Sequence, residues 1–154
     1  MVIYSILVVL ALALTGAYYV ISQPANVDGI TCDTLEHTVM HVHSNLSVII
    51  DNRALTVPAA IGINDNTCLY WLHTHDISGL IHVESPVFAN YTLGQFIDIW
   101  KKTQQNSETL ALLDNSTVTA YVNNVLYACD YRNVVLRDHE SIRLVGISLG
   151  QIKG

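Results

Sequence analysis

Histidine is the residue whose type and spacing in this chain could do chemistry, because six of its seven copies fall in two short windows. The windows hold His37, His41 and His43 in the first and His73, His75 and His82 in the second. Residues two apart on a strand point to the same face, so each His-x-His pair projects together. Two such pairs on neighbouring strands could supply three or four imidazoles to one metal ion.

Imidazole nitrogens without a thiolate suit Cu(II) and Zn(II). We therefore predict a site for a copper ion, with zinc as second choice, whose ligands are His41, His43, His73, His75 and His82. The candidates for orienting these rings, or for adding a ligand, are Asp76, Glu84, Glu36 and His37. Because protons compete for imidazole nitrogens, binding should weaken as the pH falls. The alternative is a structural network of hydrogen-bonded histidines, and His139 is expected to be an ordinary surface residue.

Enzymatic readings have weaker support. The run from His73 to Asp76 partly matches the His-x-His-x-Asp-His of metallo-β-lactamase-like hydrolases, but no Asp-His pair follows it. The chain has no Gly-x-Ser-x-Gly, phosphate-binding or dinucleotide-binding motif. Whether there is a catalytic activity stays open, with Glu84 or Asp76 as a general base beside a metal-bound water. The net charge of −6 and the lack of a basic stripe argue against nucleic-acid binding.

The first 22 residues predict a membrane anchor. Residues 2–21 are uncharged and largely apolar, and about 20 such residues span a bilayer. A retained anchor is favoured over a cleaved signal peptide, because no Lys or Arg precedes the run. We expect a transmembrane anchor over 1–22, a linker over 23–29 and a domain over 30–154. The expected location is the cell membrane, single-pass, with the domain on the extracytoplasmic side, where its three N-glycosylation sequons could be used.

The three cysteines support a disulfide. Cys32 and Cys68 each stand just before one histidine window, which favours their pairing and an oxidising compartment. Cys129 would then be left over.

The pattern of apolar residues predicts an α+β fold. Alternation over 39–51 places His41 and His43 on the polar face of a strand, and 68–75 and 81–83 read as further strands. Thr92 and Gln95 form a capping box before a helix over 93–104. Strands are expected at 118–122, 125–127, 134–136 and 142–145. The predicted fold is an N-terminal transmembrane helix and a small, mainly antiparallel β domain with one main helix, for which a β-grasp-like topology is one candidate.

The same motifs resemble an uncharacterised family of small, mostly membrane-anchored, extracytoplasmic proteins of archaea and bacteria. The resemblance covers nearly the whole chain from Gly29 onward. The residues that carry it are Cys32, Glu36, His41-Val-His43, residues 57–63, 68–76, 79–86 and 92–96, Tyr121-Val-Asn-Asn124 and residues 135–139. It implies an anchored, extracytoplasmic protein whose two histidine windows form one unit, and it implies no activity.

These observations lead to two main hypotheses. The first is a membrane-anchored metal-binding module for storage, delivery or sensing of copper or zinc. The second is an accessory or structural subunit that packs against other subunits of a membrane complex, such as a copper-dependent monooxygenase or oxidase. A filament subunit is disfavoured, because no charged leader precedes the apolar run.

Overall fold

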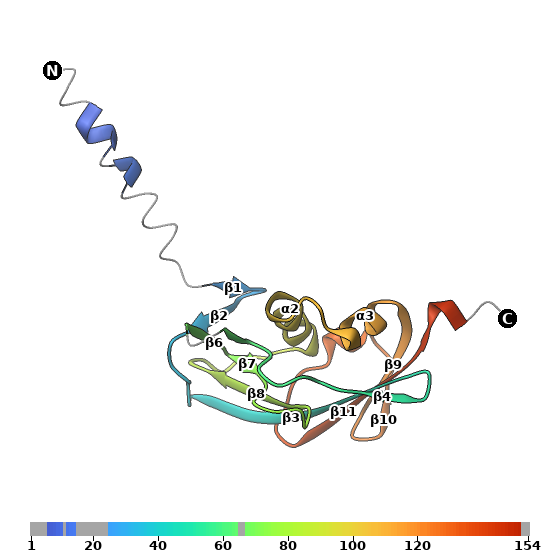
Figure 1. Ribbon diagram of the computed structural model, residues 1–154. Helices are drawn as coiled ribbons and strands as arrows, with labels where there is room; N and C mark the ends of the chain where they lie inside the picture. The colour runs from blue at the N-terminus through green and yellow to red at the C-terminus, as the bar shows by residue number, and fades with distance from the viewer. Residues whose placement is uncertain (1–5, 11, 15–24, 65–66, 152–154) are drawn as a thin grey trace.

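A computed structural model describes residues 6–10, 12–14, 25–64 and 67–151 of the chain. Two sheets and two α-helices make up an α+β domain (Figure 1). The larger sheet has seven strands in the order β10-β9-β11-β3-β8-β7, with β4 paired to β3. Its strands are β3 (Met40–Ile50), β4 (Arg53–Leu55), β7 (Leu72–His73), β8 (Leu80–Ser85), β9 (Ser116–Val122), β10 (Val125–Tyr127) and β11 (Glu140–Ser148).

The smaller sheet has the order β1-β2-β6-β5 and lies beside helix α2 (Figure 1). Its strands are β1 (Asn26–Val27), β2 (Ile30–Asp33), β5 (Ile63–Asn64) and β6 (Cys68–Tyr70). A disulfide between Cys32 and Cys68 joins β2 to β6, as the sequence predicted. Cys129 is exposed and free. Strand β1 begins at Asn26, inside the segment that was predicted as a linker over 23–29.

Helices α2 (Leu93–Thr103) and α3 (Glu108–Asp114) cover one face of the larger sheet (Figure 1). The predicted capping box opens α2, since Thr92 Oγ1 accepts from the Gln95 N–H and the Gln95 side chain accepts from the Thr92 N–H. Phe96 and Trp100, both on α2, are buried in the hydrophobic core. Two 3₁₀ helices, η1 (Tyr131–Asn133) and η2 (Leu149–Gln151), follow β10 and β11.

Strand β3 is the centre of the larger sheet. It pairs parallel with β11 on one side and antiparallel with β8 on the other. Along β3, Leu46, Val48 and Ile50 are buried, whereas His41 and His43 lie on the opposite, open face. The predicted alternation is therefore confirmed, and it leaves the histidines on the face that the helices do not cover.

The predicted transmembrane helix over 1–22 is wrong as a description of the structure. Residues 6–10 and 12–14 are helical, but a helix needs about 20 residues to cross a bilayer. In the described part of the chain, none of the helices is both long and apolar enough for this. Residues 1–5, 11 and 15–22 lie outside the described residues. The single-pass membrane location, which rested on that helix, is corrected with it.

Three further predictions of secondary structure are also corrected. The strand predicted over 68–75 is two strands in different sheets, because the chain bends at Trp71 between β6 and β7. Helix α3 was not predicted, so the domain has two α-helices where one was expected. Residues 134–136 form only an isolated bridge, from Val135 to Thr92.

Candidate metal centre

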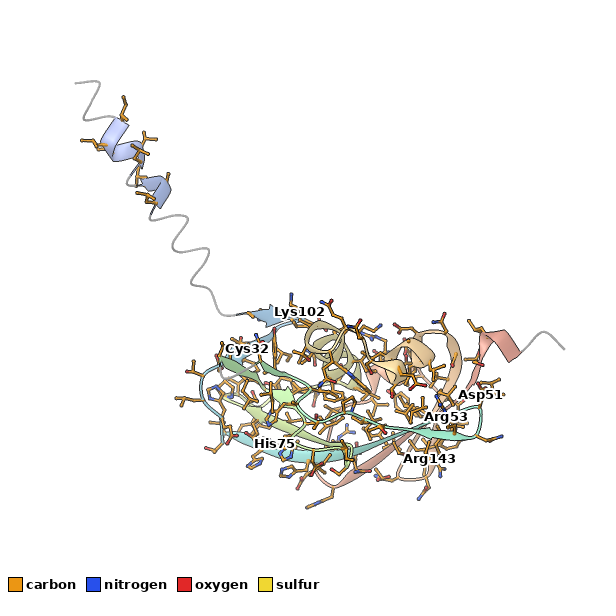
Figure 2. All side chains as sticks on the ribbon, in the orientation of Figure 1. Cys32, Asp51, Arg53, His75, Lys102 and Arg143 are labelled. Carbon is orange, nitrogen blue, oxygen red and sulfur yellow. A yellow bond between two sulfur atoms is a disulfide. The ribbon has the colours of Figure 1, made fainter. Side chains whose placement is uncertain are left out.

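Three adjacent strands bring the histidines together on the open face of the larger sheet. In the order β3-β8-β7, His43 lies directly opposite His82, and His82 lies directly opposite His73. Two residues before His43 on β3, His41 lies opposite Glu84 of β8. Directly opposite residues share a face of the sheet, so the pairing register alone places these side chains in one cluster. Figure 2 shows His75 on the side of the sheet that faces away from the helices.

Four residues of this cluster form what we call the inner group: His73, His75, His82 and Glu84. Each offers one ligand atom, and these atoms all lie within 4.8 Å of one another. The Nε2 atoms of His73 and His75 are 3.2 Å apart. His82 Nδ1 lies 3.6 Å from Glu84 Oε1. Such distances are those of donors that could converge on a single ion.

Three residues form the outer group: His41, His43 and His82, whose ligand atoms also lie within 4.8 Å of one another. His43 Nε2 is 3.1 Å from His82 Nδ1. His41 Nε2 is 3.3 Å from Glu84 Oε1, so the carboxylate reaches this group too. The structure thus brings all five predicted ligands together, but as two overlapping groups rather than one.

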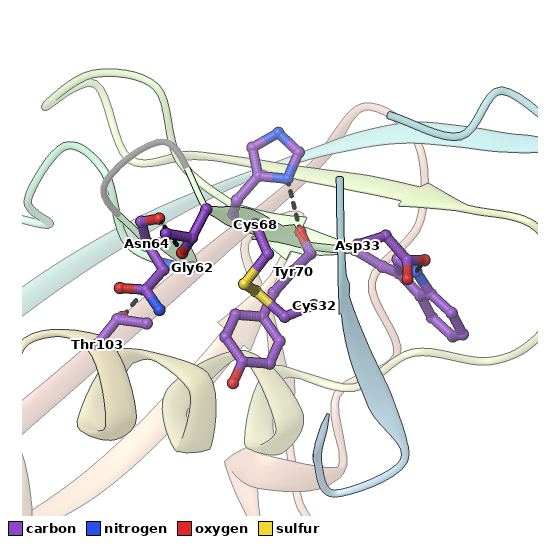
Figure 3. Close-up of a disulfide and its surroundings, with 10 residues drawn as sticks. Cys32, Asp33, Gly62, Asn64, Cys68, Tyr70 and Thr103 are labelled. Carbon is purple, nitrogen blue, oxygen red and sulfur yellow. Dashed lines mark hydrogen bonds between the residues drawn. A yellow bond between two sulfur atoms is a disulfide. The ribbon is translucent and has the colours of Figure 1, made fainter. Parts of the chain in front are cut away.

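The backbone fixes the orientation of His73. Its Nδ1 lies 3.0 Å from the carbonyl oxygen of Tyr70, the contact marked by a dashed line at Tyr70 in Figure 3. Because a carbonyl can only accept, Nδ1 carries the proton and the lone pair of Nε2 is left to face His75. The Tyr70 N–H is in turn bonded to the Gly62 carbonyl. This is the arrangement that holds an imidazole ready to bind a metal.

Burial tunes the charges of the inner group. His73 is fully buried, and burial lowers its pKa to about 4. Burial, followed by the neighbouring His75, lowers the pKa of His82 to about 4 as well. Both imidazoles are therefore neutral at pH 7 and have no proton to lose before binding a metal. Their neutrality also means that they do not compensate a buried carboxylate.

Glu84 is that carboxylate. It is only 6 % exposed, and burial, together with the Glu36 carboxylate, raises its pKa. Among the described residues its Oε2 atom has no hydrogen-bond partner. A buried acceptor without a partner is costly unless something else occupies it. A cation bound between the imidazoles would compensate this oxygen.

A cavity of about 330 Å³ adjoins the inner group at His75. Asp33, Glu36 and Cys68 are among its lining residues. His75 is exposed, unlike His73, so the inner group can be reached from this side. The two carboxylates would attract a cation towards it.

The remaining predicted residues lie around the cluster. His37 Nε2 lies 2.7 Å from Asp33 Oδ2, which also accepts from the Trp71 indole N–H, so His37 belongs to a separate network. Asp76 is exposed and accepts from the Ser78 N–H. In the described part of the chain, neither metal-binding group includes Asp76, His37 or Glu36. The charge of Glu36 contributes to the raised pKa of Glu84.

Asp138 is a neighbour of the cluster that was not predicted. Its Oδ1 accepts from the His43 N–H at 2.9 Å and lies 4.0 Å from His43 Nδ1. The contact spans 95 residues and depends on the parallel pairing of β11 with β3. No local pattern in the sequence signals it.

Comparison with known protein families, with curated proteins and with solved structures finds no match to this chain. The family resemblance therefore stays a prediction.

Proposed function

We propose that the protein binds one transition-metal ion at the inner group, with Cu(II) preferred and Zn(II) second, and that it serves to store, deliver or sense this ion. The observation that carries the proposal is the convergence of four donor atoms within 4.8 Å, one of which belongs to a buried carboxylate. Chance clusters of exposed acidic groups are common, whereas this group is mainly imidazole and includes two buried residues.

The donor set supports the choice of metal. Three imidazole nitrogens and one carboxylate oxygen suit Cu(II) or Zn(II), and hard cations such as Ca²⁺ prefer sites built from oxygens. Between the two, divalent copper binds a given nitrogen and oxygen site more tightly than zinc. The order copper before zinc follows from this general trend.

The charges support binding at neutral pH. His73 and His82 are already neutral there, and the Glu84 carboxylate gains a counter-charge when a cation binds. Buried polar groups that are costly to the fold alone are typical of functional sites. A structural network would be expected to satisfy Glu84 within the protein, and Glu84 Oε2 has no such partner in the described part of the chain.

The test is metal content and affinity. We would purify the full chain without a histidine tag, add Cu²⁺ or Zn²⁺, wash, and measure retained metal by mass spectrometry. We expect one retained ion per chain and a loss of affinity of about 100-fold or more in His75→Ala, because removing a ligand should cost at least as much as removing a residue that orients one. His139→Ala is the matched control, since His139 is an exposed turn residue.

A different result would reject metal binding. If the wild-type chain retains neither metal, and His75→Ala lowers its thermal stability by more than His139→Ala does, the histidines form a structural network. Circular dichroism of each variant would show whether the fold is intact. The proposal would then be rejected.

A further inference from the structure

The two metal-binding groups overlap at one residue. His82 belongs to the inner group with His73, His75 and Glu84, and to the outer group with His41 and His43. It sits between them on β8, directly opposite His43 on one side and His73 on the other. The neighbouring ring centroids are 4.5 Å away for both His43 and His75. No other residue of the described chain is shared by both groups.

Sharing makes the two groups compete. A neutral imidazole carries one N–H and one lone pair, so His82 can coordinate only one ion at a time. If an ion in the inner group holds this lone pair, the outer group has only His41 and His43 left. An ion in the outer group likewise leaves the inner group incomplete.

The two groups also differ in their surroundings. The side chains of His41 and His43 are 46 % and 32 % exposed, whereas His73 and Glu84 are buried. The inner group has four donors, including the carboxylate, and the outer group has three imidazoles. An ion should therefore be held more tightly at the inner group and be exchanged more readily with solvent at the outer one.

We propose that the cluster holds one ion in two alternative positions, an inner holding position and an outer exchange position, with His82 as the ligand common to both. This inference rests on the proposed metal binding. Glu84 helps to connect the positions, because its Oε1 lies 3.6 Å from His82 Nδ1 and 3.3 Å from His41 Nε2. An ion can then pass between them without losing all of its protein ligands.

The experiment uses the full chain and Zn²⁺, which is diamagnetic, with imidazole resonances followed by ¹H–¹⁵N NMR. In the wild type we expect one ion, with shifts at His73, His75 and His82. In His75→Ala, which changes an exposed side chain, the ion should move and shift His41 and His43 instead. In His82→Ala both sets of shifts should be lost. His139→Ala should behave as the wild type.

Exchange is measured separately, by the rate at which excess chelator removes Cu²⁺. The double variant His41→Ala/His43→Ala should still hold one ion, but we expect it to release the ion about tenfold more slowly, because the exchange position has lost two ligands. Both residues are on the open face, so the variant should fold, and circular dichroism would check this.

Each contrary result identifies what has failed. Two ions bound together in the wild type would overturn the alternation. The outer position would be overturned if zinc shifts His73 but not His41 or His43 in His75→Ala. An unchanged release rate in the double variant would also overturn it, because the ion would then leave the site on the side of His75. If the wild type binds no ion at all, it is the proposed function that fails.

Discussion

Glu84 and His41 face each other across β8 and β3, with Oε1 of the carboxylate 3.3 Å from Nε2 of the imidazole. The side chain of Glu84 is 7 % exposed and that of His41 is 46 % exposed. His41 is therefore open to solvent, whereas the carboxyl group of Glu84 is held inside the protein. The second oxygen of Glu84 has no hydrogen-bond partner in the described part of the chain. The carboxylate is thus poorly satisfied by the fold and well placed for a cation.

The first prediction concerns the substitution Glu84→Gln. Without metal, we expect it to stabilise the fold at pH 7 by about 1 kcal/mol, because it removes a buried charge whose pKa the fold raises. With metal, it should weaken binding by about 100-fold or more. Urea unfolding in the presence of chelator gives the first quantity, and metal competition gives the second. If Glu84→Gln is less stable than the wild type without metal, this would contradict the proposal that Glu84 serves to bind a cation.

The second prediction is the pH dependence of the metal-free protein. His73 and His82 have a pKa of about 4 in the folded state, against an ordinary value of 6.5. Between these values the unfolded chain binds more protons than the folded one, so stability should be lost as the pH falls from about 6.5 through 4. Urea unfolding at a series of pH values, with chelator present, measures this.

Glu84 contributes with the opposite sign. Its folded pKa is raised, so its contribution to stability is lost as the pH rises above its ordinary value of 4.5. Repeating the series with Glu84→Gln should therefore steepen the gain in stability from pH 4 to 6.5. A flat profile in that variant would mean that His73 and His82 are not protonated on unfolding in this range.

A feature of this site could be predicted from the sequence when it depends on residues that are close together along the chain. The alternation along 39–51 placed His41 and His43 on one face, and the capping box at Thr92 gave the start of α2; both are local patterns. The two cysteines preceding the windows gave the disulfide. The convergence of the windows on one cluster was also predicted, because two His-x-His pairs on neighbouring strands place their side chains close together when they share a face of the sheet.

What the sequence did not reveal depends on distant contacts. The chain bends at Trp71, between β6 and β7, and the two strands belong to different sheets. The continuous run of apolar and aromatic residues there gives no sign of this bend. His73 and His75 do approach each other, yet one is buried and the other exposed, because the strand ends at His73. The role of His82 as the shared residue follows from the register of three strands, which no spacing in the sequence specifies.

The third prediction concerns the disulfide. It links β2 to β6 across 36 residues and so joins the two segments that precede the histidine windows. We expect Cys32→Ser/Cys68→Ser to lower the free energy of unfolding by about 2–4 kcal/mol, as a constraint on the unfolded chain is lost. Metal affinity should fall as well, because Tyr70, the last residue of β6, holds His73 through its carbonyl oxygen. Cys129→Ser is the control and should change neither, since Cys129 is exposed and free. Equal stability of the double variant and the control would refute the prediction.

The fourth prediction concerns Gly62, which supports the strand that carries His73. Its φ is +75°, and an added Cβ would lie 2.5 Å from the Leu72 carbonyl oxygen and 3.1 Å from His73 Cβ. Gly62→Ala should therefore push β7 away and weaken metal binding. Gly29→Ala is a matched control, because Gly29 has a φ of +82° but no atom within 4 Å of an added Cβ.

Both alanines carry the strain of a left-handed backbone, about 1 kcal/mol. Gly62→Ala should cost about 1–3 kcal/mol more than Gly29→Ala, because the added methyl group overpacks a filled space. Unfolding in urea measures the difference in stability, and metal competition measures whether it reaches the site. The position of His73 would be shown to depend on this close approach if Gly62→Ala loses affinity while Gly29→Ala keeps it. If the two variants lose the same stability and bind metal alike, the approach of Gly62 to β7 does not hold His73 in place.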